Sequence, residues 1–503
     1  MRGQRSDKNS TQRRKGAKTQ GESTCASAPL RLCVELIVVL ALCCMASLGA
    51  SRRPLRFSDI PPSFRPWLKE RGLTESSFDT YVTNINRQTA EREERGEYEH
   101  LINYALQSSR FTRLPRIEPA LSAREFVQGF NETQRQLWLG ETKIYRPPCS
   151  VLPDTAQQRL REFIKSLRQS TDDERLRYFQ QLSESRRKSD SQLFAGFCHA
   201  YADTMRFLYL KEFRAGNEAG PTSAQVAALY QTRGHSTDTQ IEANFAVHQA
   251  LAMIRTDQPK ASLNRVLIVG PGLDFAPRTD LLDLFGPQSY QPFAVADSLL
   301  SLGLADESRL HIHCVDINER VIAHLQHVSQ SKAHQLSLLS GIADTPTLHL
   351  TDEYRLFFRN FGGALGKSTV LSVPPEFSGH LSKTVTVRPE LLSHFSADRF
   401  NLITESYDSA ETYDLIIVTN VFPYFSDVEL LLALANVAKM LAEGGYFVHN
   451  EPRVVAPAVT QPLSIPLLQS RTFLIAASGE KQGSTGLYDF AGIHQKRSIQ
   501  ESK

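Results

Sequence analysis

The run VLIVGPGLDF at 266–275 limits the folds open to this chain more than any other segment. Four apolar residues typical of a β-strand lead directly into a Gly-x-Gly turn. Gly270 and Gly272 can adopt positive φ and carry no Cβ, so the backbone there can approach a ligand closely. At the carboxyl end of a first parallel strand, this turn predicts a nucleotide-type ligand, and a tight turn without a ligand is the alternative.

Strand and helix patterns alternate after this turn. Apolar strand runs are separated by amphipathic stretches, and the last run is opened by two glycines. This alternation predicts an α/β fold with a Rossmann-like, doubly wound and mostly parallel sheet. The predicted strands lie at 309–316, 413–419 and 446–449, and the predicted helices that alternate with them lie at 319–328 and 427–442.

The carboxyl ends of these strands carry the candidate ligand-binding side chains. Gly272, Asp316 and Asn420 each follow or end a strand, and ligands of doubly wound sheets lie at those ends, so we expect the three to converge. An acid at the tip of the second strand can accept hydrogen bonds from both hydroxyls of a ribose. Two later runs, 461–475 and 486–496, are separated by GEKQGS and predict a terminal antiparallel hairpin.

The order of glycine turn, acid, strand ending in Asn and Gly-Gly strand resembles that of class I S-adenosylmethionine-dependent methyltransferases. Chemotaxis-receptor methyltransferases have the most similar pattern, which is matched by FNLI at 400–403, YDLIIVTNVFPYF at 413–425 and GGYFVHNE at 444–451. The resemblance implies S-adenosylmethionine as cofactor. It implies that Asn401 and Leu402 lie against the adenine, Asp316 holds the ribose, Gly270 and Gly272 face the methionine part, and Asn420 lines the pocket near the sulfonium.

Three residues depart from the family pattern. Ile268 stands where many members have an acid, and Thr419 stands where the chemotaxis enzymes have an Arg. Asp274 replaces a third glycine, and its carboxylate is a substitute acceptor for the ammonium group of the ligand. The receptor-glutamate substrate of the chemotaxis enzymes therefore does not carry over.

Two insertions are also expected. Gly272 and Asp316 are 44 residues apart, against about 20 in the dinucleotide fingerprint, which predicts an insertion near 276–289. A second insertion at about 331–398 contains a Gly-rich stretch. We interpret it as a lid or a substrate-recognition element, with a surface excursion of no role as the alternative.

The N-terminal half carries no nucleotide motif. Residues 51–240 predict a mainly α-helical domain ahead of a methyltransferase-like domain at 241–503, because apolar residues recur at helical spacing. Thr239 and Glu242 match a capping box that opens a helix. Helical patterns cover 97–108, 121–138, 156–169, 172–184 and 191–213.

The first fifty residues have a membrane-targeting pattern. Residues 1–29 predict a basic disordered tail, and 30–50 predict a signal peptide or membrane anchor, whose apolar run is short for a membrane span of about 20 residues. Either would export the chain or associate it with a membrane. A start at Met45 would instead leave it cytoplasmic.

Charge and cysteine usage exclude several classes. Residues 1–31 hold a surplus of six positive charges, so the net charge of +3 leaves −3 for the rest, and no nucleic-acid partner is expected. Beyond the apolar segment, Cys149, Cys198 and Cys314 are too few and too widely spaced to predict a disulfide framework. We expect them as small buried apolar side chains, and we expect no metal site.

Three functions from different classes remain. In an active methyltransferase of unidentified small-molecule or protein acceptor, alignment carries most of the rate, and Tyr424, His449 and Glu451 are candidate bases. A catalytically silent binding module at the membrane or cell envelope is the alternative, favoured by Ile268, Asp274 and the export-like N-terminus, because extracytoplasmic space normally lacks S-adenosylmethionine. The missing third glycine and the terminal hairpin disfavour a nicotinamide-dependent oxidoreductase.

Overall fold

The computed structural model describes residues 52–140, 145–214, 223–276, 282–407, 412–478 and 486–497. Arg52–Lys503 fall into one compact unit. The predicted tail at 1–29 and the predicted signal peptide or anchor at 30–50 lie outside the described residues. Within the described ranges, no helix combines the length and apolarity needed to cross a membrane.

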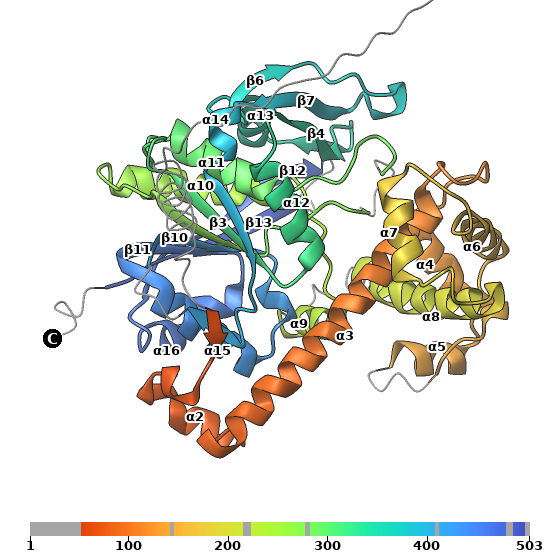
Figure 1. Cartoon of the computed structure of the whole chain (residues 1–503), viewed down its shortest axis with the longest axis horizontal. Helices are drawn as coiled ribbons and strands as arrows, with labels where there is room; N and C mark the ends of the chain where they lie inside the picture. The colour runs from red at the N-terminus through yellow and green to blue at the C-terminus, as the bar shows by residue number, and fades with distance from the viewer. Residues whose placement is uncertain are drawn as a thin grey trace, which may run out of the picture. The chain divides into compact units, whose positions relative to one another are not determined.

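An eight-stranded sheet forms the centre of the C-terminal half (Figure 1). Five neighbouring strands are parallel, and β2 is buried from Val266 to Val269, as a central parallel strand must be. β13 pairs antiparallel with both β11 and β12. The predicted α/β, Rossmann-like, mostly parallel sheet with a terminal antiparallel hairpin is confirmed. In spatial order the strands are β5 Leu348–Leu350, β12 Leu467–Ser478, β13 Gly486–Gln495, β11 Leu441–His449, β10 Tyr413–Val418, β2 Arg265–Val269, β3 His311–Asp316 and β8 Phe395–Arg399.

The strand order changes direction at β2, which is parallel to β3 on one side and to β10 on the other. In doubly wound sheets, the carboxyl ends of strands beside such a switch point form a ligand crevice. Gly270 follows β2, Asp316 ends β3 and Asn420 lies beyond the end of β10. The helices that connect these strands are α11 Gln291–Ser301, α12 Glu319–Ser329, α15 Asp427–Met440 and α16 Pro457–Thr460.

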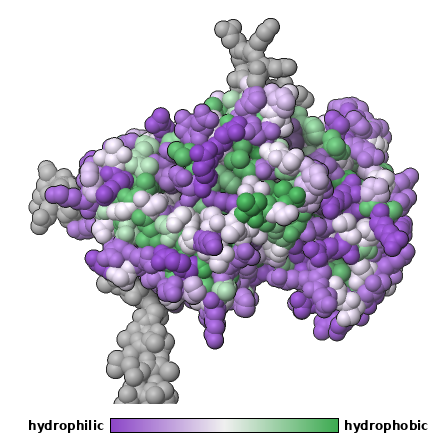
Figure 2. All heavy atoms as spheres, turned by 90° about the horizontal axis from the view of Figure 1, so that it is seen from above, coloured by the Kyte–Doolittle hydropathy of each residue, from purple (hydrophilic) through white to green (hydrophobic). Residues whose placement is uncertain are grey.

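A second, smaller sheet is inserted between α12 and β8. The predicted insertion at 331–398 extends too far, because 395–398 belong to β8 of the main sheet. As an edge strand with one buried face, β8 shows alternating burial and lacks the continuous apolar run of a central strand. Figure 2 shows the molecule from above the view of Figure 1, and apolar and polar side chains are mixed on this face. Leu356 and Val370 of the insertion are exposed. The inserted elements are β4 His334–Ala343, β5, α13 Asp352–Asn360, β6 Gly366–Thr369, β7 His380–Val387 and α14 Pro389–Leu392.

Helices dominate the N-terminal half. The predicted segment 97–108 is the last part of the long helix α3, and the predicted helix 121–138 is two helices, because Asn131 caps a new one. The described part of the chain begins beside the C-terminal half, where β1 Arg52–Pro54 pairs antiparallel with β9 Glu405–Tyr407. The helices are α2 Arg65–Glu70, α3 Glu75–Gln107, α4 Pro119–Gln128, α5 Glu132–Leu139, α6 Asp154–Ser166, α7 Glu174–Leu182, α8 Asp190–Tyr209, α9 Ser223–Thr232 and α10 Ala243–Asp257.

The predicted capping box of Thr239 and Glu242 is wrong. Glu242 is the N-cap residue of α10, but its side chain does not cap the helix. Its carboxylate accepts hydrogen bonds from Ser340 Oγ and Tyr354 Oη instead, at 2.8 Å each. The side chain that the local sequence assigned to the helix cap therefore hydrogen-bonds to the inserted elements instead.

Cys149 and Cys198 form a disulfide, with Cα atoms 5.5 Å apart. The expectation that both are unpaired was wrong, because packing of the Cys149–Val151 turn against α8 joins positions 49 residues apart in sequence. Cys314 is a free, buried side chain of β3, as expected. Disulfides persist mainly in oxidising compartments.

Candidate functional site

A cavity lies at the carboxyl ends of the parallel strands, and we call it the strand-end cavity. It is lined by six of the seven candidate cofactor-binding residues, which come from four separate loops of the sheet. These six are Gly270, Gly272, Asp316, Asn401, Leu402 and Asn420.

Asp316 ends β3 and is 8% exposed. Its carboxylate accepts a hydrogen bond from the backbone N–H of Asn318 at 2.9 Å and also from those of Ile317 and Gly272. Burial raises the pKa of Asp316 to about 6, against the opposing effect of these amides. These backbone amides orient the carboxylate, and its remaining lone pairs can accept hydrogen bonds from ligand hydroxyls.

Asn401 fixes the turn that follows β8. Its Oδ1 accepts from the backbone N–H of Ile403 at 3.0 Å, and its Nδ2 donates to Oδ1 of Asn86 in α3 at 3.3 Å. Both polar atoms of the Asn401 side-chain amide therefore have hydrogen-bond partners within the protein. With Phe400, Leu402 and Ile403, the turn gives the cavity an apolar wall.

Asn420 follows β10 with a φ of 60°, a left-handed conformation that few non-glycine residues adopt. Its Oδ1 accepts from Asn450 Nδ2, and its backbone N–H donates to Asn450 Oδ1, both at 2.8 Å. The loops after β10 and β11 are thus tied together. Unusual backbone conformations of this kind cluster at functional sites.

Asn420 also lines a larger hollow next to the cavity, which we call the outer groove. The two share Ser236, Asp238, Asn420 and Tyr424. The loops after β10 and β11 form one wall, and α4 and the end of α8 form the other. Further lining residues are Glu118, Pro119, Ala120, Leu208, Lys211, Glu212, Tyr230, Arg233, Thr239, Gln240, Ala243, Asp274, Pro423, Asn450, Glu451 and Pro452.

Sequence reasoning missed the part of the cavity that the N-terminal half supplies. Thr89 and Glu93 of α3 and the segment 235–238 line it. Burial raises the pKa of Glu93 to about 7, and the neighbouring Asp316 contributes to this rise. The available signal was a glycine within a helical pattern, because a Cβ at Gly96 would collide with the backbone carbonyl of His235.

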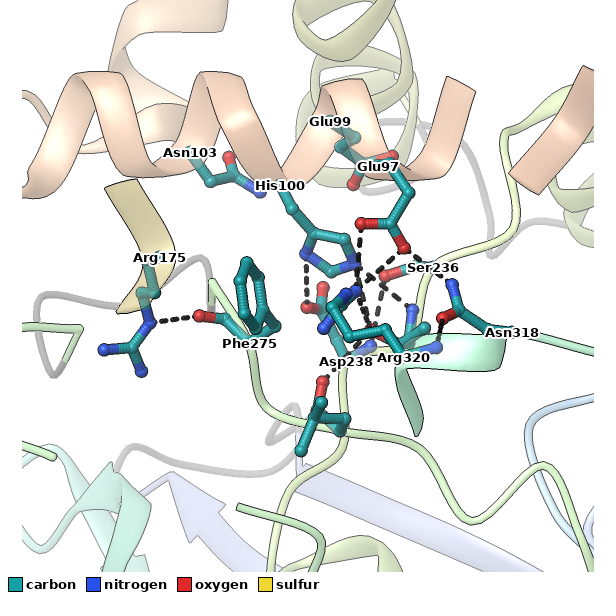
Figure 3. Close-up of polar contacts among 12 residues, drawn as sticks. Glu97, Glu99, His100, Asn103, Arg175, Ser236, Asp238, Phe275, Asn318 and Arg320 are labelled. Carbon is teal, nitrogen blue, oxygen red and sulfur yellow. Dashed lines mark hydrogen bonds and ion pairs between the residues drawn. The ribbon is translucent and has the colours of Figure 1, made fainter. Parts of the chain in front are cut away.

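A buried network holds α3 over the strand ends (Figure 3). Glu97 of α3 accepts from Arg320 Nη2 at 2.8 Å and from Asn318 Nδ2 at 2.6 Å. Burial would raise the pKa of Glu97, but the Arg320 guanidinium lowers it below its ordinary value. The His100 ring lies 3.3 Å from the carboxylate of Asp238, so α3 is also anchored to the 235–240 segment.

The 235–240 segment lies directly on the glycine turn. The carbonyl of Thr237 accepts from the backbone N–H of Leu273 at 2.7 Å, and Thr237 Oγ1 donates to the Leu273 carbonyl at 3.1 Å. Gly272 has a φ of 74°, and a Cβ there would stand 2.8 Å from the Thr237 carbonyl oxygen. The chain's own packing therefore requires glycine at this position.

Asp274 is the one assigned residue that the structure does not bring to the strand-end cavity. It lies beyond the 235–240 segment and lines the outer groove and a small neighbouring pocket. Burial raises the pKa of Asp274 to about 8, with Asp238 adding to the rise and Arg175 opposing it.

The three candidate bases are placed differently. Tyr424 lines the cavity, and burial raises its pKa, so its hydroxyl keeps its proton. Glu451 lines the outer groove and accepts from Arg453 Nε at 3.1 Å. His449 is fully buried, and its Nε2 lies 2.9 Å from Nε2 of His494. Across the described ranges, no three His, Cys, Asp or Glu side chains are grouped to hold a metal ion.

No family model and no curated protein matches this chain. Among solved structures, it is similar to N-methyltransferase NodS from Bradyrhizobium japonicum WM9 at 14% identity, over 50% of this chain and 95% of that chain, with a TM-score of 0.23. It is also similar to magnesium protoporphyrin IX methyltransferase (ChlM) from Synechocystis PCC 6803, solved with bound SAM, at 9% identity over 59% and 97% of the two chains, with a TM-score of 0.26. At these identities the likeness concerns the fold alone.

Proposed function

We propose that the strand-end cavity binds S-adenosylmethionine and that the protein transfers its methyl group to an acceptor in the outer groove. The observation that carries this proposal is the buried Asp316 carboxylate at the switch point of the sheet, beside an apolar wall. Asp316 would accept the ribose hydroxyls, and Phe400, Leu402 and Ile403 would flank the adenine. These residues fit the adenosine part of the cofactor.

The methionine part of the cofactor has a different set of neighbours. Many methyltransferases carry an acid at the position of Ile268, which is an apolar side chain buried in β2. Glu93 and Asp238 are the acidic side chains that line the cavity from the covering side, and either can accept from an ammonium group. We therefore assign the methionine end to the space between the glycine turn and α3.

When bound, the cofactor supplies a methyl group on a sulfonium, which is already an activated leaving group. The protein's task is then to align the acceptor and to exclude water. Asn420 and Tyr424 lie where the cavity meets the outer groove, so we propose that they position the acceptor atom. We also propose that the chain is related to chemotaxis-receptor methyltransferases, whose pattern the segments 400–403, 413–425 and 444–451 resemble.

The test is formation of S-adenosylhomocysteine by the full chain, supplied with S-adenosylmethionine and pools of small-molecule and protein acceptors. Turnover that is lost in Asp316→Ala is the expected result. A folded protein that produces no S-adenosylhomocysteine with any pool, and fails to bind the cofactor, would contradict the proposal.

A second candidate is the catalytically silent binding module at the membrane or cell envelope. Two observations favour it: the glycine turn is covered by Thr237, and Cys149 is joined to Cys198. Two measurements distinguish the candidates. The silent module retains a folded cavity without any S-adenosylhomocysteine formation, and a C-terminal tag would locate it outside the cytosol.

A further inference from the structure

A small pocket beside the outer groove contains two acidic side chains that the proposed methyl transfer does not use. Glu242 and Asp274 both line it, and we call it the carboxylate pocket. Thr239, Gln240 and Asp274 line the outer groove as well. The pocket and the outer groove are therefore neighbours that share these three residues.

Glu242 is 5% exposed, and one of its oxygens is fully used. Its Oε1 accepts from Ser340 Oγ at 2.8 Å, from the Gly341 backbone N–H at 2.9 Å and from Tyr354 Oη at 2.8 Å. Its Oε2 is buried and finds no hydrogen-bond partner among the described residues. A Cβ on Gly341, which lines the pocket, would lie 3.6 Å from Oε2.

Asp274 presents a second oxygen of this kind. Its Oδ1 is buried and, within the described part of the chain, makes no hydrogen bond. The cation in the pocket wall is Arg175, whose guanidinium donates to the carbonyls of Phe275 and Phe285. A buried polar group without a partner is costly, so both oxygens favour a ligand that donates hydrogen bonds.

We propose that the carboxylate pocket binds a primary ammonium group and, resting on the proposed function, that this group belongs to the methyl acceptor. An ammonium group has one positive charge and three donors, so it can donate to Glu242 Oε2 and Asp274 Oδ1 together. A divalent metal ion suits the pocket less, because the described residues supply no third His, Cys, Asp or Glu to it. The acceptor is thus an amine-bearing molecule that extends along the groove towards Asn420.

The test is a calorimetric titration of the full chain at pH 9, where Asp274 with its pKa of about 8 is ionised and n-butylamine is still protonated, with n-butanol as the uncharged match and MgCl2 as a separate arm. We expect saturable binding of the amine and none of the alcohol or the metal. Glu242→Gln and Asp274→Asn should each weaken amine binding at least tenfold. Glu390→Gln, which alters an exposed acid on α14, should leave it unchanged.

Three results overturn the ammonium site: no saturable amine binding, equal affinity in Asp274→Asn, or Mg²⁺ binding that both variants lose. Glu242→Gln alters an acceptor of three buried donors, so Asp274→Asn decides the outcome if that variant fails to fold. In the methyl-transfer assay, diamines should be methylated in preference to matched diols, and equal use of both overturns the assignment to the acceptor. Amine binding without cofactor binding would refute the proposed function and leave the pocket standing, whereas the reverse result would refute the pocket alone.

Discussion

The two ends of the strand-end cavity are built in different ways. At the end that we propose for the adenosine, which we call the adenosine end, Asp316 and the 400–403 turn face the cavity and are oriented by hydrogen bonds within the protein. At the glycine end, the chain itself lies on the turn, through the carbonyl of Thr237. A glycine turn after a first strand can therefore serve internal packing as much as ligand approach, whereas a buried carboxylate with free lone pairs points to a ligand more directly.

α3 and the 235–240 segment cover the glycine end of the cavity. The N-terminal half therefore has a structural role at this site that its sequence did not predict. α3 is fixed over the strand ends by Glu97 and Arg320, and the 235–240 segment is fixed by Thr237 and Asp238. Substitutions at the glycine end should therefore reduce the stability of the fold, and substitutions at the adenosine end should weaken ligand binding.

The largest effect is expected from Arg320→Ala. This change leaves the buried Glu97 carboxylate without its ion-pair partner, which typically costs about 3–5 kcal/mol of stability. Urea denaturation measures the loss in the free energy of unfolding. Arg87→Ala is the matched control on the exposed face of α3, where its pair with Glu91 should be worth less than about 1 kcal/mol. Similar small losses in both variants would refute the anchoring role.

Gly272→Ala should be the next most damaging. A non-glycine residue pays about 1–2 kcal/mol in the left-handed region, and a clash with the Thr237 carbonyl adds about 1–3 kcal/mol. The control is Gly196→Ala in the exposed part of α8, where a Cβ meets no described heavy atom within 4 Å and should be neutral or stabilising. If Gly272→Ala folds as stably as the control, the 235–240 segment does not rest on the turn.

Asp316→Ala tests the adenosine end. Removal of a charged acceptor should weaken S-adenosylmethionine binding by about 1–3 kcal/mol, measured by calorimetry, while the fold persists. Asp172→Ala, which removes an exposed carboxylate far from the sheet in sequence, is the control. Unchanged affinity in Asp316→Ala would remove the ribose assignment.

The smallest effect concerns pH. Because burial raises the pKa of Asp274 to about 8, the folded state retains a proton there that the unfolded state has already lost, so stability from this group falls as pH rises to 8. Asp274→Asn should therefore gain stability over the wild type by about 1–2 kcal/mol between pH 6.5 and pH 8. Denaturation curves at both pH values check this, and a stability difference that does not change with pH would contradict it.

Four of the five parallel strands were predictable because each carries its own apolar signal, whereas the edge strand β8 does not. Central strands such as β2 are continuous apolar runs, and their ends fix where Gly270, Asp316 and Asn420 meet. These signals are local, so one sequence is sufficient to find them.

The parts that were missed depend on contacts between distant positions. Thr237 meets Leu273, Cys149 meets Cys198, and Glu242 turns to Tyr354, in each case through tertiary packing that overrides a local pattern. At the site itself, the side-chain amide of Asn401 shapes the turn after β8, a contact that the sequence did not predict, and the placement of Asn401 against the adenine stays a prediction.

The most direct measurement is a calorimetric and thermal-shift titration of the full chain with S-adenosylmethionine, with NAD as the control nucleotide. We expect saturable binding of S-adenosylmethionine, a stabilisation of about 2.7 kcal/mol at a hundred times the dissociation constant, and no saturable response to NAD. A folded protein that gives neither heat nor a thermal shift with S-adenosylmethionine, or that binds NAD in its place, would contradict this expectation.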